Sequence, residues 1–369
     1  MGAVTIARGA CHPLFVFEVG LSVDLDACER ELREPSGRQE IRHRGRGPHF
    51  FQYRPAPLRV SQQTGEVQIG AYRTDPRVDL VLYDFGAVSA GYRIPIEGSL
   101  ESLVDLSLTL RTHPELFADA RRRVEELIRG LHSAIVKPRV DETAEDYLVF
   151  QLEEVTDSRD ALSFCADHAA TIAQVLRGER GPLSPEEIRD ATESRISFGV
   201  QDVTVVDWEA ALVLDPDPEE VRAVLEVANV QLLEMRWLDA QVDRALERSY
   251  DLAARAGRPS WRMPASLNAD LNQVAELQVE SAVLLERVTN ALKFFGEEYL
   301  TRIYRLVAAR FHLADWDASI TRKLETIERL YGKLADRAAG RRMELLEWVV
   351  ILLIALEILL SFVPGLRGR

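Results

Sequence analysis

The chain has 369 residues, of which 47% are hydrophobic and 28% are charged, and its formal net charge at pH 7 is -14. This composition is that of a folded globular protein and excludes a largely disordered chain. The negative charge excludes a broad nucleic-acid-binding surface, because such a surface needs a dominant basic face. The three cysteines are far apart and lack the spacing of a zinc site, so we expect buried, reduced thiols.

The first part of the chain predicts β-strands. Residues Leu14–Leu25 predict the first strand, and Asp24 or Asp26 can cap a short helix after it. Three further segments are rich in β-branched and aromatic residues and are separated by turn residues: Glu66–Arg73, Val78–Tyr83 and Ala87–Ile94. Together they predict an antiparallel meander.

Helices are expected to cover this sheet. Apolar residues recur every three or four positions in Ser99–His113 and in Pro114–Ile135, and the proline suits the first turn of the second helix. Three elements then follow: a strand at Tyr147–Val155, a helix at Arg159–Leu176, and a hairpin or bent strand at Arg195–Leu214. We therefore predict an α+β domain over residues 1–215, with a mainly antiparallel sheet.

Residues 216–344 predict a helical stalk. Helix-forming sequence runs through this segment and is interrupted near Gly257–Ser260 and near Ala314–Ala318. Apolar residues fall near heptad spacing in each of the three pieces. Those of the first piece are Leu225, Ala228, Leu232, Met235, Val242 and Leu246. Short connections favour antiparallel neighbours, so we predict a coiled-coil-like three-helix stalk rather than one long rod.

The C-terminal segment predicts a transmembrane helix over residues 345–363, followed by a short tail, 364–369. At 1.5 Å per residue the helix would span roughly 28 Å, close to a hydrocarbon core of about 30 Å. Leu346, Glu347 and Trp348 open the segment, and the tryptophan suits the headgroup level. This predicts a tail-anchored, single-pass membrane protein with most of the chain in the cytoplasm.

Glu357 lies near the centre of this apolar run, where an ionised carboxylate costs several kcal/mol unless it is paired or protonated. Two interpretations follow. In the first, Glu357 faces other membrane helices and the protein is a homo-oligomer that contacts the lipid bilayer. In the second, the segment is a buried amphipathic helix of a soluble protein.

The C-terminal stretch Leu346–Ile358, which reads Leu-Glu-Trp and then an apolar helix with a second Glu, resembles the closing signature of the required-for-meiotic-nuclear-division family. The residues from Arg322 to Leu334 are similar to that family's helix before the membrane. The resemblance is strong over about the last sixty residues and weaker elsewhere.

This resemblance implies a single-pass membrane protein without established catalytic activity. Mitochondrial members of that family support organellar protein synthesis, apparently by holding ribosomes near the inner membrane. The N-terminus of this chain lacks the features of a transit peptide, so a bacterial plasma-membrane member fits better. A ribosome or another RNA-associated partner is the expectation that follows.

Catalytic motifs find little support in the sequence. Asp84-Phe85-Gly86 matches the metal-binding turn of protein kinases, but the accompanying kinase motifs are missing, so we interpret it as a turn. Ser89 lacks the spacing of a nucleophile elbow. The seven histidines never show metal-ligand spacing, and no nucleotide-binding loop occurs. We therefore predict no catalytic site, no metal site and no cofactor site, and we expect that the chain is not an enzyme.

One arginine-rich segment is a candidate patch for an anionic partner. Between residues 38 and 54, arginines alternate with histidines and aromatic residues, a mixture that suits RNA or anionic headgroups. The candidate residues are Arg42, Arg44, Arg46 and Arg54. The alternative is an arginine-rich loop that balances the acidic body and leads into a strand.

These observations favour a tail-anchored scaffold or tether that recruits a cytosolic partner, by family analogy the translation machinery. The alternative is a membrane-attached hydrolase or ligand-sensing domain whose site the sequence does not reveal. A deep polar pocket lined by convergent charged residues would favour the alternative, and a sheet packed solid would count against it.

Overall fold

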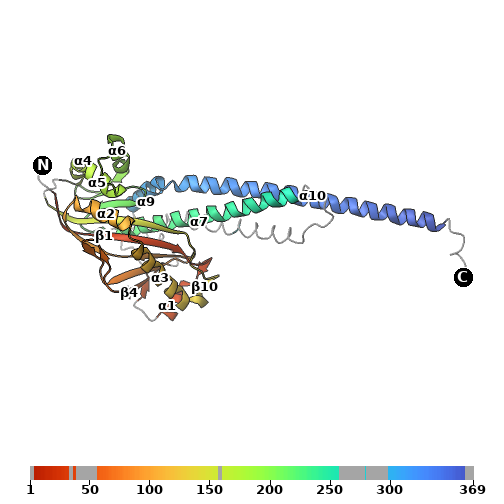
Figure 1. Cartoon of the computed structure of the whole chain (residues 1–369), viewed down its shortest axis with the longest axis horizontal. Coiled ribbons are helices and arrows are strands. Elements are labelled where there is room, and N and C mark those ends of the chain that lie inside the picture. The colour runs from red at the N-terminus through yellow and green to blue at the C-terminus, as the bar shows by residue number, and fades with distance from the viewer. Residues whose placement is uncertain are drawn as a thin grey trace. The chain divides into compact units, whose positions relative to one another are not determined.

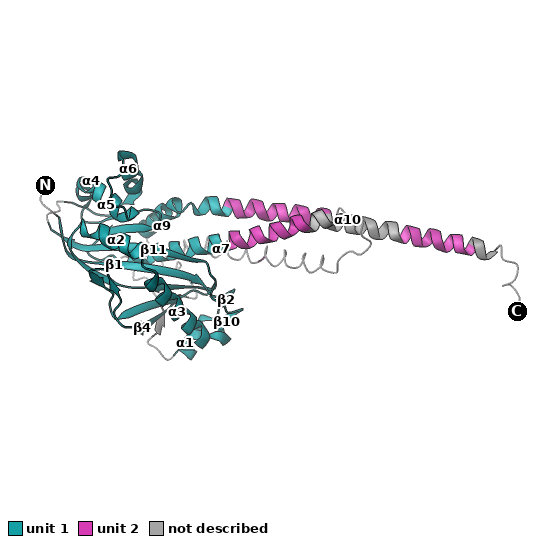
Figure 2. Cartoon of the chain, in the orientation of Figure 1, with its two compact units in different colours: residues 1–237, 283–317 teal, residues 238–282, 318–369 magenta. Residues whose placement is uncertain are grey.

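The computed structural model describes residues 4–32, 36–38, 56–156, 160–256, 279 and 298–361; for 36–38, 252–256, 298, 334–345 and 358–361 it describes the backbone alone. The chain divides into two compact units (Figure 2). Unit 1 comprises Met1–Trp237 and Val283–Asp317, and unit 2 comprises Leu238–Ala282 and Ala318–Arg369.

Unit 1 is built on a ten-stranded sheet (Figure 1). Among the described strands the order is β12-β13-β14-β11-β1-β8-β7-β4-β3, and β9 also pairs with β1. Every pairing is antiparallel except that of β11 with β14. The strands are β1 (Thr5–Glu18), β3 (Ser36–Arg38), β4 (Leu58–Gln63), β7 (Arg77–Leu82), β8 (Ala87–Gly91), β9 (Ile94–Ser99), β11 (Ala144–Val155), β12 (Arg195–Ile196), β13 (Val203–Val206) and β14 (Ala210–Leu214). The predicted α+β class is confirmed.

Two small two-stranded sheets accompany the large one, and helices complete the unit. The small sheets pair β2 (Ser22–Val23) with β10 (Ile135–Val136), and β5 (Gln68–Ile69) with β6 (Tyr72–Arg73). The helices of the first 200 residues are α1 (Leu25–Glu31), α2 (Ser102–Arg111), α3 (Pro114–Gly130), α4 (Ala161–Asp167), α5 (Ala169–Arg177) and α6 (Pro185–Glu193). Asp24 caps α1 as predicted, because its side chain accepts hydrogen bonds from the backbone of Asp26 and Ala27.

Several predicted elements differ in their bounds. The first strand begins at Thr5 rather than Leu14, and the segment predicted as a strand over Glu66–Arg73 forms only the short β5 and β6. The single helix predicted over Arg159–Leu176 is divided into α4 and α5 at His168. The hairpin predicted within Arg195–Leu214 is confirmed as β13 and β14.

The main hydrophobic core lies on one face of the sheet. Successive side chains of a strand point to opposite faces, and the odd-numbered residues Cys11, Phe15 and Phe17 of β1 belong to this core together with residues of α2, α3 and α5. Phe15 packs edge-on against Phe117 of α3, with ring centroids 5.8 Å apart. Burial of this face supplies the main stabilising contribution of the unit.

The opposite face of the sheet is more polar, and the N-terminal half of α7 (Glu219–Ala256) lies on it (Figure 1). The even-numbered residues of β1 on this face include His12 and Glu18, both buried. His12 Nδ1 lies 3.4 Å from Nη1 of Arg222, and Glu18 interacts with Glu234. Six residues of strand (12 to 18) and twelve of helix (222 to 234) each span roughly 18–20 Å, so α7 runs along β1. Its first turns therefore lie over His12.

The turn between β7 and β8 needs glycine at position 86. Gly86 has φ +110°, and a Cβ built on it would lie 1.9 Å from the carbonyl oxygen of Gly20. We expect Gly86→Ala to lower the free energy of unfolding by about 3 kcal/mol, because the backbone must move to relieve this overlap. Urea denaturation checks this value. Gly65→Ala is the control, since a Cβ there meets no atom within 4 Å; equal effects of the two substitutions would contradict the prediction.

Helix α9 (Glu298–Arg310) belongs to unit 1, where charged and aromatic contacts join its C-terminal end to the rest of the unit. Arg310 binds Asp190 of α6 and Asp207 at the end of β13, with Nη2 2.8 Å and 2.5 Å from their carboxylates. Arg177 of α5 also binds Asp207, at 2.6 Å. Tyr147 of β11 packs edge-on against Phe311, just beyond α9. These contacts tie a late segment of the chain to the sheet.

Unit 2 contains the end of α7 and most of α10 (Leu313–Ser361). Within this unit, the predicted heptad residue Val242 is buried on α7, and Ile320, Ile327 and Tyr331 are buried on α10. Nζ of Lys323 lies 2.7 Å from carboxylates of Asp239 and of Asp243, which joins the two helices. The helix break predicted near Ala314–Ala318 lies instead at Phe311–His312, where His312 has φ 50°. Most of the second predicted stalk helix lies outside the described residues.

The predicted transmembrane helix is not supported. Among the described residues, no helix combines the length and the apolar character needed to cross a membrane. Glu347 and Glu357 enclose only the nine uncharged residues Trp348–Leu356 of α10, which span about 14 Å of a roughly 30 Å hydrocarbon core. The expectations of a tail anchor, of Leu346, Glu347, Trp348 and Glu357 as its residues, and of a single-pass membrane location are therefore wrong.

Candidate functional site

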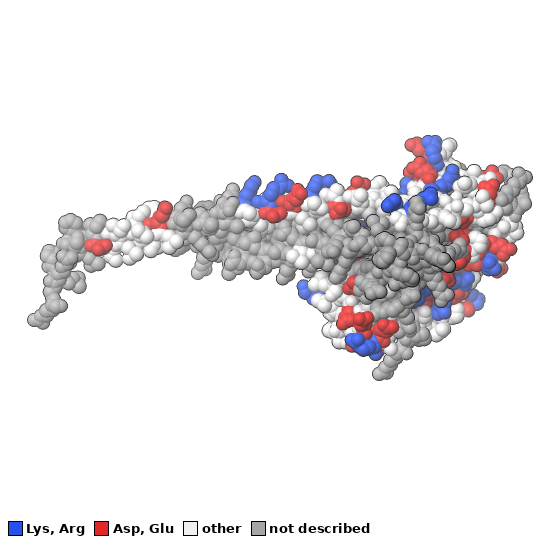
Figure 3. Space-filling view, turned by 180° about the vertical axis from the view of Figure 1, so that it is seen from behind, with Lys and Arg blue, Asp and Glu red and all other residues white. Residues whose placement is uncertain are grey.

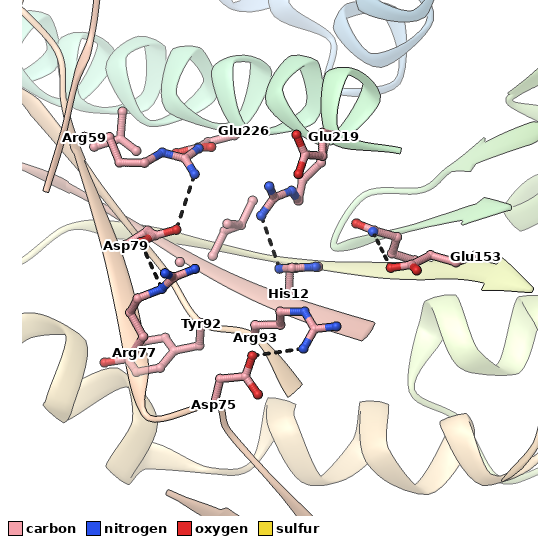
Figure 4. Close-up of a pocket in the computed structure, with 15 residues that line it drawn as sticks. His12, Arg59, Asp75, Arg77, Asp79, Tyr92, Arg93, Glu153, Glu219 and Glu226 are labelled. Carbon is pink, nitrogen blue, oxygen red and sulfur yellow. Dashed lines mark hydrogen bonds and ion pairs between the residues drawn. The ribbon is translucent and has the colours of Figure 1, made fainter. Parts of the chain in front are cut away.

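A polar cavity of about 360 Å³ lies between the sheet and the first turns of α7 (Figure 4). Glu219 and Glu226 extend from α7 on one side. On the other side lie His12 of β1, Asp79 of β7 and Arg93 of the connection between β8 and β9. The lining residues are His12, Leu14, Arg59, Asp75, Arg77, Asp79, Val81, Gly91, Tyr92, Arg93, Gln151, Glu153, Glu219, Arg222 and Glu226. All of them belong to unit 1.

The strand registers bring these residues together. His12 is opposite Val149 of β11, two residues from Gln151, and Leu14 is opposite Gly91, which in turn is opposite Asp79 of β7. The same register places residues of β4, including Arg59, beside β7. On α7, positions 219, 222 and 226 share one face because they are three and four residues apart. The cavity is thus a product of pairing between segments far apart in the sequence.

Three arginines surround His12. The positive charges of Arg222, Arg93 and Arg59 all act on its imidazole. Two of them have carboxylate partners, since Arg93 lies 2.9 Å from Asp75 and Arg59 lies 3.3 Å from Asp79. Arg59 Nε is buried and has no hydrogen-bond partner among the described residues.

Arg222 differs from the other two arginines. Among the residues that the structure describes, no carboxylate oxygen lies within 4.0 Å of its guanidinium, and its hydrogen-bond contact is with His12 at 3.4 Å. Burial lowers the pKa of Arg222, whereas the nearby negative charge of Glu226 raises it. A half-buried guanidinium with most of its five donors free is a strong site for an anion.

His12 is neutral at physiological pH. Its pKa is well below the usual value, first because burial disfavours the charged imidazolium and second because Arg222 and Arg93 repel it. A guanidinium can only donate hydrogen bonds, so Nδ1 of His12 accepts from Arg222. A hydrogen bond with the backbone of Tyr92 holds the ring from another direction. The acceptor nitrogen of the neutral imidazole is therefore already engaged by Arg222.

We expect the buried, neutral His12 to make stability fall at acid pH. Its pKa is lower in the folded state than in the unfolded chain, so the unfolded chain binds more protons and gains stability below pH 6.5. Each pH unit in this range costs about 1.4 kcal/mol. Between pH 7 and pH 5, the free energy of unfolding of His12→Gln should therefore fall by about 1–2 kcal/mol less than that of the wild type. Urea denaturation in buffers without phosphate measures this difference.

The control is His132→Gln, since His132 is an exposed histidine. It should show the same pH dependence as the wild type. An unchanged pH dependence of the His12→Gln variant would contradict the assignment of His12 as neutral.

The cavity also offers acceptors. Glu219 is exposed, Glu226 is buried, and both belong to the first two turns of α7. Gln151 is 6% exposed, and its Oε1 has no hydrogen-bond partner among the described residues, although its Nε2 donates to Glu153 at 3.3 Å. The site therefore combines donors with spare capacity and acceptors with spare capacity.

The residues expected to carry function lie elsewhere. Arg42, Arg44, Arg46 and Arg54 fall outside the described residues, so the anionic-partner patch stays a prediction. Leu346, Glu347, Trp348 and Glu357 are exposed on α10. In the part of the chain that the structure describes, no group of three or more His, Cys, Asp or Glu side chains could hold a metal ion.

Sequence reasoning missed the cavity residues. One signal was present: buried strand β1 carries His12 and Glu18 with the same parity, so both point to one face. A second signal is the spacing of Arg222, Glu226 and Asn229 in a segment otherwise rich in apolar residues. Polar residues on the same face of a strand and of a buried helix indicate a polar interface.

A family model described as the N-terminal domain of the uncharacterized protein MJ0711 matches residues 8–220. The chain belongs to this family. The family domain contains the whole sheet side of the cavity, including His12, Arg59 and Arg93, and it ends at the first turn of α7. Arg222 and Glu226 lie just beyond its boundary.

One curated relative is the uncharacterized protein MJ0711 of Methanocaldococcus jannaschii. It is 24% identical over 240 residues, which cover 64% of this chain and 72% of the relative. No solved structure matches the chain.

Proposed function

We propose that the chain is a ligand-binding domain that takes a small anionic molecule into the cavity between the sheet and α7. The observation that carries this proposal is the convergence of Arg59, Arg93 and Arg222 on the buried, neutral His12. Arg59 and Arg93 already have carboxylate partners, so Arg222 is the guanidinium whose charge an anion in the cavity would compensate.

Arg222 is the part of the arrangement that an internal ion pair does not explain. Removing a guanidinium from water costs several kcal/mol unless a counter-charge compensates, and among the described residues no carboxylate is in contact with it. Ligand binding would provide that compensation. The first turns of α7 add to the attraction, because the N-terminus of a helix favours negative charge.

The surface supports a small ligand over an extended polyanion. On the face drawn in Figure 3, basic and acidic side chains of the described residues are interspersed, without a continuous basic area. The formal net charge of -14 also argues against binding of an extended polyanion. A cavity of about 360 Å³ is at the lower end of the range of small-molecule sites.

The test is a thermal-shift series on the full chain with inorganic phosphate, sulfate and malate, each at 10 mM. We expect at least one of these anions to raise the Tm by 2 °C or more, whereas sodium chloride at the same ionic strength does not. Isothermal titration calorimetry then gives the affinity. If none of the three anions stabilises the protein, the proposal is wrong.

The scaffold expectation stays a prediction. Recruitment of a ribosome or RNA-associated partner, homo-oligomer formation and the lack of catalytic activity follow from the resemblance and from motifs, and the Arg42–Arg54 segment that would carry the first of these lies outside the described residues. The cavity favours the alternative of a ligand-sensing domain, because it is a polar pocket lined by convergent charges.

A further inference from the structure

We infer that the ligand is a phosphate monoester whose remaining part carries hydroxyl groups, as a sugar phosphate does; this inference rests on the proposed function and names the ligand class of the same site. Its basis is the arrangement of free donors and free acceptors in different parts of one cavity.

The donors suit phosphate better than carboxylate. A carboxylate offers two oxygens and is satisfied by one forked guanidinium, whereas a phosphate monoester offers three terminal oxygens and a charge near -2. Around His12 there are three guanidiniums, and Arg222 and the Nε of Arg59 have donors to spare. Nδ1 of His12 accepts from Arg222 and so helps to hold this guanidinium in the cavity.

The acceptors suit hydroxyl groups. Glu219 and Glu226 are seven residues apart on α7, two helical turns, and so lie on the same face as Arg222. A phosphate beside either carboxylate would be repelled, so these side chains must face an uncharged part of the ligand that donates hydrogen bonds. Gln151 Oε1 is a third acceptor, buried and without a partner among the described residues. Hydroxyl groups donate to such acceptors and also accept from neighbouring arginines.

The cavity lacks a platform for a nucleobase. Tyr92 is its single aromatic lining residue, apart from the imidazole of His12. The Tyr92 hydroxyl donates to Asp119 of α3 at 2.8 Å and its ring packs with Phe15, both contacts on the opposite side of the sheet. Base recognition usually relies on stacking against an aromatic face. A compact, non-aromatic phosphate ester therefore fits this lining better than a nucleotide.

The test compares ribose 5-phosphate, inorganic phosphate, ribose, malate and AMP by isothermal titration calorimetry with the full chain. We expect ribose 5-phosphate to bind at least tenfold more tightly than inorganic phosphate and at least as tightly as AMP, and ribose alone not to bind.

Two variants separate the ester part from the phosphate part. Glu219→Gln and Glu226→Gln should each weaken the binding of ribose 5-phosphate about tenfold. The affinity for inorganic phosphate should stay unchanged or increase, because each substitution removes a charge that repels phosphate. Glu219 is exposed, so its variant should fold normally.

Different failures have different meanings. Binding of malate without binding of phosphate esters would overturn the ligand class and leave the anion site intact. Equal losses for ribose 5-phosphate and phosphate in both variants, or tighter binding of AMP, would also overturn the ligand class. If no compound in the series binds, the proposed function falls with it.

Discussion

Replacing Arg222 by methionine should weaken the binding of inorganic phosphate, and of ribose 5-phosphate, about 100-fold. The guanidinium has no carboxylate within 4.0 Å among the described residues, so its donors are available to a ligand. Loss of a charged hydrogen-bonding group from a desolvated site costs 2 kcal/mol or more, which corresponds to a factor of at least about 30. Isothermal titration calorimetry on the wild type and the variant measures this loss.

The same substitution should change the free energy of unfolding without ligand by less than about 1 kcal/mol. The variant loses the attraction between Arg222 and Glu226, but it also no longer has the free-energy cost of burying a guanidinium, and the two effects offset each other. Arg73→Met is the matched control, because Arg73 is exposed and pairs with Glu66 away from the cavity; it should leave binding unchanged. A large loss of stability with unchanged binding would assign Arg222 a purely structural role.

Replacing Arg310 by methionine should lower the free energy of unfolding by about 3 kcal/mol. Arg310 binds two carboxylates, and one of them, Asp207, is 1% exposed. Removing one partner from a buried ion pair leaves an uncompensated charge and costs about 3–5 kcal/mol. Arg177 still contacts Asp207 in the variant, which sets the expectation at the lower end. Urea denaturation at pH 7 measures the change.

The control is Arg305→Met on the same helix. Arg305 is exposed, and its replacement should change stability by no more than about 0.5 kcal/mol. The effect of Arg310→Met should shrink at low pH, because Arg310 lowers the pKa of Asp190 to about 2 and that contribution is lost as the pH falls from about 4 toward 2. Equal effects of the two substitutions would show that the cluster contributes no more than a surface ion pair.

The sequence predicted much of the sheet because strands bury apolar residues with a period of two. The segments of β7, β8, β11 and the β13–β14 hairpin were all found within a few residues of their bounds. The predicted bounds were wrong where the side-chain character does not change at the end of an element. One such place is Thr5, where β1 begins in small and polar residues. β4 was missed because four of the six residues in its sequence, LRVSQQ, are polar.

The site was harder to predict than the fold. His12 and Arg59 come from strands β1 and β4, Arg93 from the connection between β8 and β9, and Arg222 from α7. Only the order of strands in the sheet brings them together. The order of the strands in the sheet cannot be deduced from a single sequence. The transmembrane prediction failed for a different reason: it accepted Glu357 as a paired or protonated carboxylate, although Glu347 and Glu357 leave only nine uncharged residues between them.

The central position of β1 also has a consequence for synthesis of the chain. β1 ends at Glu18, but its longest partner, β11, begins only at Ala144. At about 5–20 residues per second, a ribosome takes roughly 6–25 s to make the intervening residues. During this time β8 and β9 are the only described strands that can pair with β1, and one long edge of β1 stays uncovered. Pairing over so large a sequence separation is slow, so the newborn chain should depend on chaperones until residue 155 has emerged.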